Sequence, residues 1–594
     1  MAEFKNPNQQ GGQDNRSLLV MMLVMVGVVF GLHYYQAKTN PQTVSPSATP
    51  TATQSAPPPQ TAAVAPTTST TTAPAVATGP TVQAAAEATT VVENELYRIE
   101  FSNRGAQVRS WVLKRFKDDE GKPLDLVHDT AAMQFGYPLS LYSPYAALTA
   151  KLQQALYVPS AKDSVPVPGT LTFTYSDGTL SVTKTFTFDE TYVLHADVQV
   201  TQNGAPLHTA LSWPGGFGDQ EDANAYISTQ IDTMSGGKTD HVASKKVKGT
   251  NGATTNGPFD WAGVSDVYFA AIFLPDQPDS ASLTSLYNEI DIAKVHRKGG
   301  SGAGTPARGN TMVPILGAAL GDASGHIATR IFVGPKVASV LKSVQSTTGR
   351  NLEPVVDFGF FGIISRFLFV ALQFVHAHIA SNWGWAIVVL TLAINVLLLP
   401  LRFQTMKSAV KMQRIQPQVN AIKARYKNPK ATDPKSAEMN AEVMKLYKDN
   451  GVNMFGGCIP NLLQFPLMLA FFYMLRNVVE IRQAHWYWLP DLSHPDPTHI
   501  LPILMVVSMF IVSFYTPSPG VDPQQQKMMA FTMPLISGYF TWNYASGLAL
   551  YWATGNLVSI VVQAAMNRSS IGREMRELAA KRARRKGTTI QGKR

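Results

Sequence analysis

The sequence predicts a polytopic α-helical membrane protein with six spans, five of them in a C-terminal core, and a large extracytoplasmic all-β domain. Three observations support this fold class. The 594 residues are 45% hydrophobic and only 15% charged, which is a low charged fraction for a soluble protein. Long apolar runs occur once near the N-terminus and repeatedly in the C-terminal part. The chain between them alternates apolar and polar residues, as half-buried β-strands do.

The first part of the chain divides into three segments of different composition. Residues 1–17 are polar and are expected in the cytoplasm. Residues 18–35 are apolar and predict a first transmembrane anchor. A cleaved signal peptide is the alternative, but bulky His33 and Tyr35 lie where cleavage requires small residues. Residues 36–90 are rich in Pro, Thr and Ala with almost no charge, so we expect a disordered tether.

Residues 91–350 predict one β-sandwich domain outside the cytoplasm. Apolar residues alternate through 171–188, and Asp177-Gly178 supplies a hairpin turn between two strands. Cys458 is the single cysteine of the chain, so an intrachain disulfide is excluded. The domain must therefore be stabilised by its core alone.

The apolar segments after the β domain predict one interfacial helix and five spans. Residues 356–380 are aromatic and apolar but contain one Arg and two His, which favours an amphipathic helix at the membrane surface. Several of the following segments are shorter than the roughly 20 residues that a 30 Å hydrocarbon core requires, which implies thinning or tilt. The predicted spans are 383–401, 455–478, 499–516, 527–545 and 547–567.

Basic residues fix the expected orientation. The segment 402–450 contains 11 Lys or Arg against 4 acidic residues, and 568–594 contains 10 against 2. The loop 477–499 has one Arg against 3 acidic residues. By the positive-inside rule, 402–452 and 568–594 are cytoplasmic. With the N-terminal anchor, both termini lie inside and the β domain outside.

Three of the spans carry polar residues on one helical face. Intervals of three and four place such residues side by side on a helix. They could bond to one another in a packed bundle, each contributing about 0.6–2 kcal/mol. Three stripes together favour a hydrated cavity or pathway, because polar groups inside membranes line such spaces. The stripes are Thr391 and Asn395; Asn461, Gln464 and Met468; and Trp552, Asn556, Ser559 and Gln563.

Nothing in the sequence indicates catalysis. No span has an acidic or basic residue near its centre, which argues against a proton pump or charge-coupled transporter. Nucleotide-binding, zinc-hydrolase and nucleophile-elbow motifs are missing from the sequence. We therefore expect no enzyme, no catalytic residues, no metal site and no cofactor.

The cytoplasmic segment 402–452 predicts a helical hairpin with two apolar seams. The hairpin is either a solvated pair lying against lipid or a docking site for an apolar segment or a ribosome. Its positive charge, and that of the tail 568–594, suits anionic lipid and ribosomal RNA equally. The seam residues, spaced by three and four, are Met412, Ile415, Val419, Ile422 and Tyr426 on the first helix and Met439 and Val443 on the second.

These segments resemble the YidC/Oxa/Alb family of membrane protein insertases, in its Gram-negative form. The matching stretches run through the whole C-terminal half, and GGCIP followed by SGLALYW in a basic, five-span block is a specific signature. The stretches are NWGWAIVVLT, KMQRIQPQ, LYKDNGVNMFGGCIPNLLQFP, DPTHILPILM, DPQQQKMMAF and SGLALYWATGNLVSI. The anchor, tether and β domain match the Gram-negative architecture more loosely.

The resemblance implies an inner-membrane insertase and chaperone that works alone or with the Sec translocon. Its five spans would form a hydrophilic groove that receives the polar flank of nascent inner-membrane proteins. The outer domain would be a periplasmic β-supersandwich resembling sugar-binding folds. Two departures stand out: Asn395 takes the place of an arginine found in many members, and Trp552 follows Tyr551 where a Tyr-Tyr pair is common.

Two other functions stay open at this point. A small-solute channel or transporter with a sugar-capturing β domain would need mid-membrane ligands and inverted repeats, neither of which is visible. A purely structural partner of a larger translocon would leave the polar stripes dispensable. The sequence alone selects no ligand site on the β domain.

Overall fold

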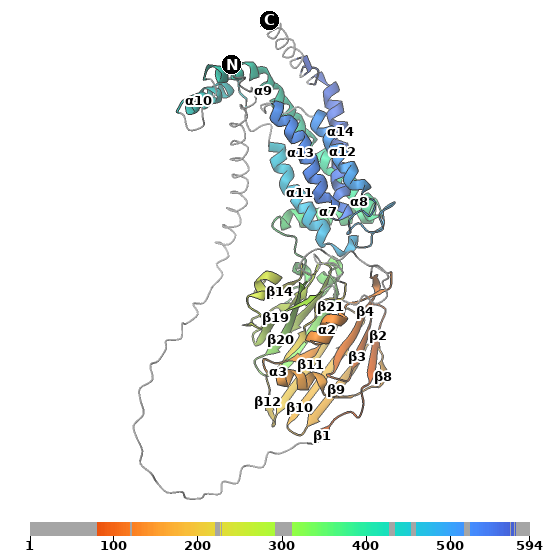
Figure 1. The fold of residues 1–594 in the computed structure, drawn as a ribbon. Coiled ribbons are helices and arrows are strands. Elements are labelled where there is room, and N and C mark those ends of the chain that lie inside the picture. The colour runs from red at the N-terminus through yellow and green to blue at the C-terminus, as the bar shows by residue number, and fades with distance from the viewer. Residues whose placement is uncertain are drawn as a thin grey trace, which may run out of the picture.

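The computed structural model describes residues 80–118, 121–219, 226, 228–291, 312–426, 434–452, 459–515, 523–570, 572–574 and 576–577. It consists of a β domain and a helical bundle that lie end to end (Figure 1). The predicted cytoplasmic N-terminus, the first anchor and most of the tether lie outside the described residues, as does the tail from residue 578.

The β domain is built from three sheets, which agrees with the predicted all-β architecture. The 11-stranded sheet has the order β1 (Thr81–Val82), β9 (Gly169–Asp177), β10 (Leu180–Phe188), β11 (Val193–Gln202), β21 (His326–Pro335), β18 (Phe269–Pro275), β17 (Trp261–Ser265), β14 (Gln230–Ser235) and β15 (Lys238–Ala243), with β7 (Val158–Pro159) on β9 and β12 (Ala205–Pro206) on β11. A 5-stranded sheet has the order β16 (Thr254–Asn256), β19 (Ala281–Asp291), β20 (Met312–Asp322), β13 (Ala210–Trp213) and β6 (Ser140–Tyr142). The other 5-stranded sheet has the order β5 (Pro123–Asp125), β4 (Gln107–Lys117), β3 (Tyr97–Ser102), β2 (Thr89–Glu93) and β8 (Asp163–Val165).

Short helices connect these strands. They are α2 (Asp129–Phe135), α3 (Ala146–Gln154), α5 (Ser244–Lys248) and α6 (Ala338–Ser343). The pairing of β2 with β8 is parallel, whereas the other strand pairs in the described chain are antiparallel.

The predicted hairpin is confirmed in β9 and β10. Asp177 Oδ1 accepts hydrogen bonds from the backbone N–H groups of Thr179 and Leu180, at 3.0 and 2.8 Å, which fixes the turn. Alternate residues of both strands point into the core, where the rings of Phe173 and Phe186 pack around Phe101 of β3. The period of two in the sequence thus corresponds to one buried face.

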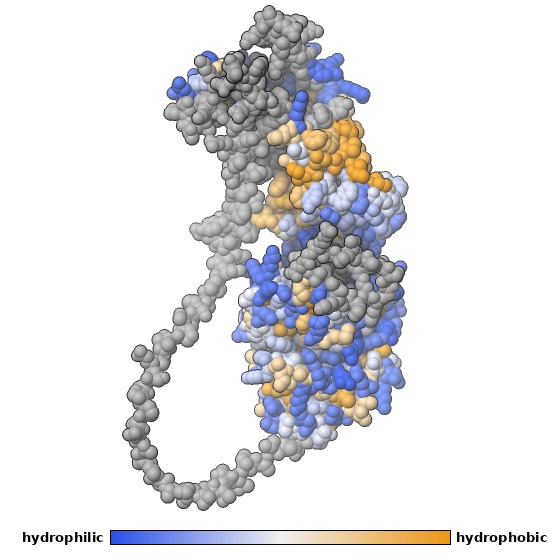
Figure 2. All heavy atoms as spheres, viewed as in Figure 1, coloured by the Kyte–Doolittle hydropathy of each residue, from blue (hydrophilic) through white to orange (hydrophobic). Residues whose placement is uncertain are grey.

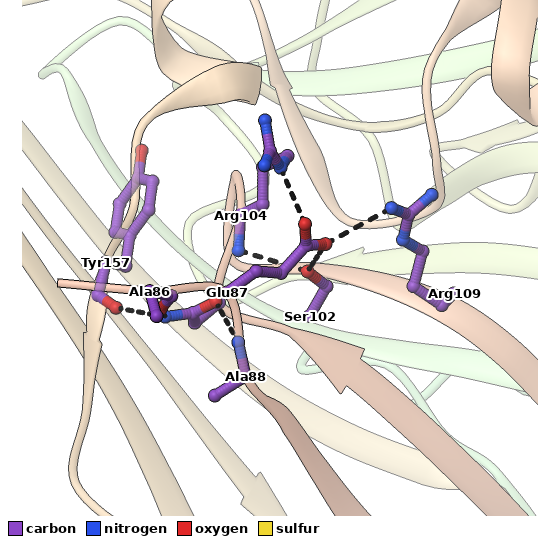
Figure 3. Close-up of polar contacts among 8 residues, drawn as sticks. Ala86, Glu87, Ala88, Ser102, Arg104, Arg109 and Tyr157 are labelled. Carbon is purple, nitrogen blue, oxygen red and sulfur yellow. Dashed lines mark hydrogen bonds and ion pairs between the residues drawn. The ribbon is translucent and has the colours of Figure 1, made fainter. Parts of the chain in front are cut away.

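The β domain begins earlier than predicted, so the tether does not extend to residue 90. β1 and the start of β2 belong to the sheets, and Glu87 between them is held by Ser102, Arg104 and Arg109 (Figure 3). Asn103 anchors the same segment, since its side chain bonds to the backbones of Ala86 and Ala88. β1 was concealed because it is an edge strand of two residues, too short to show a period of two in the sequence.

The helical bundle occupies the positions of the predicted spans. The α-helices of this half are α7 (Gly362–His378), α8 (Trp383–Leu397), α9 (Leu399–Arg425), α10 (Pro434–Asp449), α11 (Ile459–Asn477), α12 (Ile500–Tyr515), α13 (Pro523–Trp542) and α14 (Ser546–Arg568), with short 3-10 turns η2 (Glu353–Val355) and η3 (Val479–Ile481). Of the described helices, α14 alone is long and apolar enough to cross a membrane, and α7 with α8 forms a pair bent by 119° that passes the same test together. The count of six spans stays a prediction.

The boundary between α8 and α9 differs from the predicted end of this span at residue 401. α8 stops at Leu397, and α9 begins at once with Pro400 in its first turn, where a proline is tolerated because its missing N–H would be unpaired. α9 then continues without a break to Arg425, so the start of the predicted cytoplasmic loop is helical and joined directly to the bundle.

Large apolar side chains cover the outer surface of the bundle, where Figure 2 shows a hydrophobic band beside a hydrophilic β domain. Exposed members of this band include Ile503, Val507, Leu535, Phe540 and Val561. An apolar surface of this extent is expected of helices that face lipid rather than water.

The β domain is bound to the bundle through the segment that follows α11. Arg482 donates to the backbone oxygen of Lys117 at 2.8 Å and lies over the rings of Tyr268 and Phe269. Asn477 donates to the backbone oxygen of Asp357 at 2.6 Å. The buried apolar core is continuous across this junction, so the two parts form one packed unit.

Candidate functional site

The predicted polar pair of α8 lies inside the bundle. Thr391 is fully buried and Asn395 is 8% exposed. The hydroxyl of Thr391 donates to the backbone oxygen of Ile387 at 2.7 Å, and the amide of Asn395 donates to that of Thr391 at 2.8 Å. Thr391 is therefore satisfied by its own helix, as single hydroxyls in membrane helices often are. Asn395 keeps its side-chain oxygen for another partner.

That partner is Arg402, whose guanidinium lies where α8, α9 and α14 meet. It donates to Asn395 Oδ1 at 2.9 Å and to Ser559 Oγ on α14 at 3.0 Å. Ser559 in turn donates to the backbone oxygen of Gly555 at 2.7 Å. We call Asn395, Arg402 and Ser559 the guanidinium cluster. It places a half-buried positive charge between two of the predicted polar stripes.

The sequence analysis missed this role of Arg402 and counted it among the basic residues of the cytoplasmic loop. The signal was available in the spacing. Asn395 and Arg402 are seven residues apart, which is two helical turns and one face. A long arginine side chain in the first turn of α9 can reach back along that face, since side chains tilt toward the N-terminus of their helix.

Two further residues of α14, Tyr551 and the stripe residue Asn556, contact two other helices. Tyr551 stacks on Phe471 of α11, with ring centroids 4.0 Å apart, and accepts a hydrogen bond from exposed Gln464 of α11 at 3.4 Å. Asn556 donates to Ser508 Oγ of α12 at 3.2 Å. The structure thus brings Gln464 of the predicted α11 stripe against Tyr551, the neighbour of the α14 stripe, and turns Asn556 toward α12, a helix for which no stripe was predicted.

The remaining stripe residues contribute less to this arrangement. Trp552 is half-buried against the apolar core, and Met468 is half-buried on α11. Gln563 bonds to Asn567 of its own helix at 2.9 Å. Asn461 lies in α11, but its side chain is outside the described residues.

The predicted hairpin seams face each other in the structure. Met412, Ile415 and Val419 of α9 are buried against Tyr447 and Val452, with Val443 beside them. Ile422 and Met439 are also buried, and Tyr426 is half-buried at the end of α9. These side chains form the core of the hairpin itself, so they do not present an open docking surface. A salt bridge from Arg425 of α9 to Glu442 of α10, at 2.9 Å, also links the two helices of the hairpin.

Among the described residues, no group of three or more His, Cys, Asp or Glu side chains is placed to hold a metal ion. The site is polar through amides, hydroxyls and one guanidinium. Such groups can hydrate or hydrogen-bond a passing chain.

Fold and site together define a protein with a helical bundle that has an apolar outer surface, encloses a polar, positively charged cluster and carries a large β domain. Two family descriptions match the chain: "60Kd inner membrane protein" over residues 374–573 and "YidC periplasmic domain" over 89–371. The chain is 32% identical over 561 residues to the membrane protein insertase YidC of Ralstonia nicotianae, covering 91% of this chain and 94% of that protein. It is 32% identical over 489 residues to YidC of Geobacter sulfurreducens, covering 80% and 85%.

The chain belongs to the YidC family of membrane protein insertases. Residues 89–371 match the periplasmic domain of the family, and residues 374–573, which include α8 to α14, match its helical insertase region.

Proposed function

We propose that the protein inserts inner-membrane proteins into the bilayer and assists their folding, without catalysing a covalent reaction. The guanidinium cluster is the observation that carries this proposal. Insertion scales give about 2.5–3.5 kcal/mol as the cost of an arginine at the centre of a membrane helix. Arg402 follows the predicted span 383–401 directly and is half-buried in the bundle, so it bears part of that cost, and its presence there calls for a function. A passing polar segment is a partner that would use it.

In this mechanism the polar flank of a nascent chain moves along a hydrophilic groove beside the guanidinium cluster. Arg402 uses two of its five N–H donors on Asn395 and Ser559, which leaves donors for a carboxylate or a backbone oxygen of the substrate. Exposed Gln464 and half-buried Trp552 would extend the polar path. The apolar segment of the substrate would slide along the outer apolar band into lipid.

Arg402 supplies the charge that the family resemblance assigns to the position of Asn395. In this chain the side-chain amide of Asn395 accepts a hydrogen bond from the guanidinium of Arg402, whereas many family members have an arginine at the position of Asn395 itself. Attraction of acidic substrate residues therefore belongs in the proposal, although Asn395 itself cannot provide it. Energy for insertion would come from burial of the substrate's apolar surface, about 25 cal/mol per Å², and from the membrane potential acting on its charges.

The proposed partners are nascent inner-membrane proteins, the Sec translocon, the ribosome and anionic lipids. The basic residues of α9 and of the tail support the last two, because both ribosomal RNA and anionic headgroups attract positive charge. Both termini would be cytoplasmic. The hairpin would recruit substrates through exposed residues such as Met444, 55% exposed on α10, rather than through its buried seams.

Site-specific photocrosslinking to stalled nascent chains tests the proposal. Thr391 is unsuitable for a probe because it is fully buried. Probes belong at Ser559 and Gln464, with a matched control at Val561, which is 68% exposed on the outer face of α14.

Chains stalled while their polar flank crosses should crosslink at Ser559 and Gln464 and not at Val561. Chains stalled at their apolar segment should show the reverse preference. Crosslinks at Val561 alone at every stalling position would argue against a polar path.

A further inference from the structure

A cavity of about 420 Å³ lies on the β domain, far from the guanidinium cluster along the chain. It crosses the 5-stranded sheet that contains β19 and β20, and every strand of that sheet contributes to its wall. Its volume is in the range of sites that hold small organic ligands. The insertase mechanism proposed above does not use it.

Small residues keep the floor of this cavity low. Ala210 and Gly321 are directly opposite each other on the adjacent strands β13 and β20, and Ser282 of β19 lies on the same face. A side chain at Gly321 would come within 3.0 Å of Ser282 Oγ and 3.2 Å of the backbone oxygen of Thr209. The sheet face is therefore hollow here because its residues are too small to fill it.

Polar groups are fixed around the cavity. The carboxylate of Asp322 accepts hydrogen bonds from Ser280 and Ser324, and the hydroxyls of Thr254 and Thr284 bond to each other at 2.8 Å. These contacts orient acceptors and donors before any ligand arrives, which lowers the entropy lost on binding.

Among the buried side-chain polar atoms of the described lining residues, one has no hydrogen-bond partner in the protein. Thr209 is 5% exposed, and its Oγ1 is buried without a hydrogen bond. A buried hydroxyl is costly to leave unpaired, so it marks a position where a ligand or a water completes the structure.

The charge of the lining selects the class of ligand. Asp279 and Asp322 contribute carboxylates, while the described residues that line the cavity include no Lys or Arg. Anionic ligands such as phosphates are therefore disfavoured. Asn256, His208 and Tyr142 add an amide, an imidazole and a ring edge to the wall.

We propose that this cavity binds a neutral, hydroxyl-rich saccharide of a few sugar units. Sugar hydroxyls both donate and accept, which matches carboxylates, an amide and hydroxyls arranged on one wall. An extended peptide fits less well, because the cavity crosses the strands instead of following a sheet edge, where backbone pairing would hold a peptide. The inference does not depend on the insertase function.

Titration of the full-length protein with neutral saccharides tests the site. The protein is held in a detergent without sugar headgroups, since maltoside headgroups would compete. The probes are maltotriose, cellotriose and N,N′,N″-triacetylchitotriose, followed by calorimetry and saturation-transfer NMR. The first two represent glucans and the third represents N-acetylated amino-sugar glycans. The comparison therefore shows which of these two classes of saccharide the cavity prefers.

Asp279→Ala and Asn256→Ala remove exposed side chains at the rim and should each weaken binding by about tenfold. Asp240→Ala, an exposed carboxylate on β15 outside the cavity, should leave it unchanged. Insertion activity should be unaffected by all three, which separates this site from the insertase mechanism.

Absence of saturable binding for all three saccharides below about 10 mM would overturn the proposal. So would binding that Asp279→Ala and Asn256→Ala leave intact. Saturable binding of unrelated extended peptides, together with no binding of the saccharides, would instead assign the cavity to polypeptide.

Discussion

Arg402 offers the sharpest test of the proposed mechanism, because one substitution removes the charge of the guanidinium cluster. Arg402→Gln keeps a polar side chain of similar reach and loses the positive charge. The donor groups of Asn395 and Ser559 keep their acceptors within their own helices, and the side-chain amide of the new glutamine can donate to Asn395 Oδ1 in place of the guanidinium. The variant should therefore fold, which thermal unfolding of the purified protein would check.

The expected effect follows from Coulomb attraction between Arg402 and an acidic substrate residue. Two unit charges 4 Å apart attract by about 4 kcal/mol at an effective dielectric constant of 20. Arg402 is half-buried, and solvent screening lowers the useful part to about 1–2 kcal/mol. That corresponds to roughly 5- to 30-fold in an equilibrium or rate.

The assay compares two substrates that differ by one residue in the translocated flank, Asp in one and Asn in the other. Insertion into vesicles that contain the purified protein is measured by protease protection. Wild type should favour the Asp substrate by about the factor above, and Arg402→Gln should lose that preference. Arg402→Lys should keep much of it, because the charge remains although the two-pronged contact is lost. An unchanged Asp-to-Asn ratio in Arg402→Gln would refute the role of this charge.

Three other contacts give direct tests. Changing Thr391 and Asn395 together to Leu should slow insertion of substrates with polar flanks more than insertion of apolar substrates. Asn395→Leu alone should account for most of this loss, because the hydroxyl of Thr391 bonds within its own helix. Equal effects of Thr391→Leu and Asn395→Leu would contradict this. Lys184→Met should destabilise the β domain by about 3 kcal/mol in urea unfolding, since the buried ammonium serves three backbone oxygens, whereas exposed Lys238→Met should be neutral. Burial raises the pKa of Glu87, but hydrogen bonds from Ser102, Arg104 and Arg109 lower the pKa overall. The ionised carboxylate therefore contributes below about 1 kcal/mol to the stability of the β domain. This contribution is present above the usual glutamate pKa near 4.3 and is lost as pH falls below it. Hydrogen exchange of the strands around Glu87 should follow that pH dependence in wild type and not in Glu87→Gln.

Elements with strong periodicity could be predicted from the sequence. The hairpin at Asp177 follows from a period of two and a turn residue that caps its own backbone. The helices of the bundle follow from apolar length. Both signals are local, so no tertiary knowledge is needed to read them.

Features that depend on a neighbour could not be predicted in the same way. β1 precedes the predicted domain because its pairing partner lies almost a hundred residues away on β9. Thr391 looked like a groove residue, but its hydroxyl had a partner within the helix, which spacing cannot reveal. The sequence placed the apolar seams of the hairpin on the correct helices, but it could not show whether the seams face a substrate or each other. In the structure they face each other.

The continuity of α9 connects the two regions that the sequence analysis treated separately. Arg402 lies in the first turn of this helix and Met412 and Ile415 lie further along it, in the core of the hairpin. The distance from Arg402 to Ile415 is about 20 Å at 1.5 Å per residue, and Pro417, where a helix can kink, lies beyond both. A tilt of the hairpin would therefore move Arg402 as part of the same rigid segment. Because the guanidinium is held by only two hydrogen bonds, to Asn395 and Ser559, such a tilt would change its position relative to α8 and α14 before it disturbed the packing of the bundle.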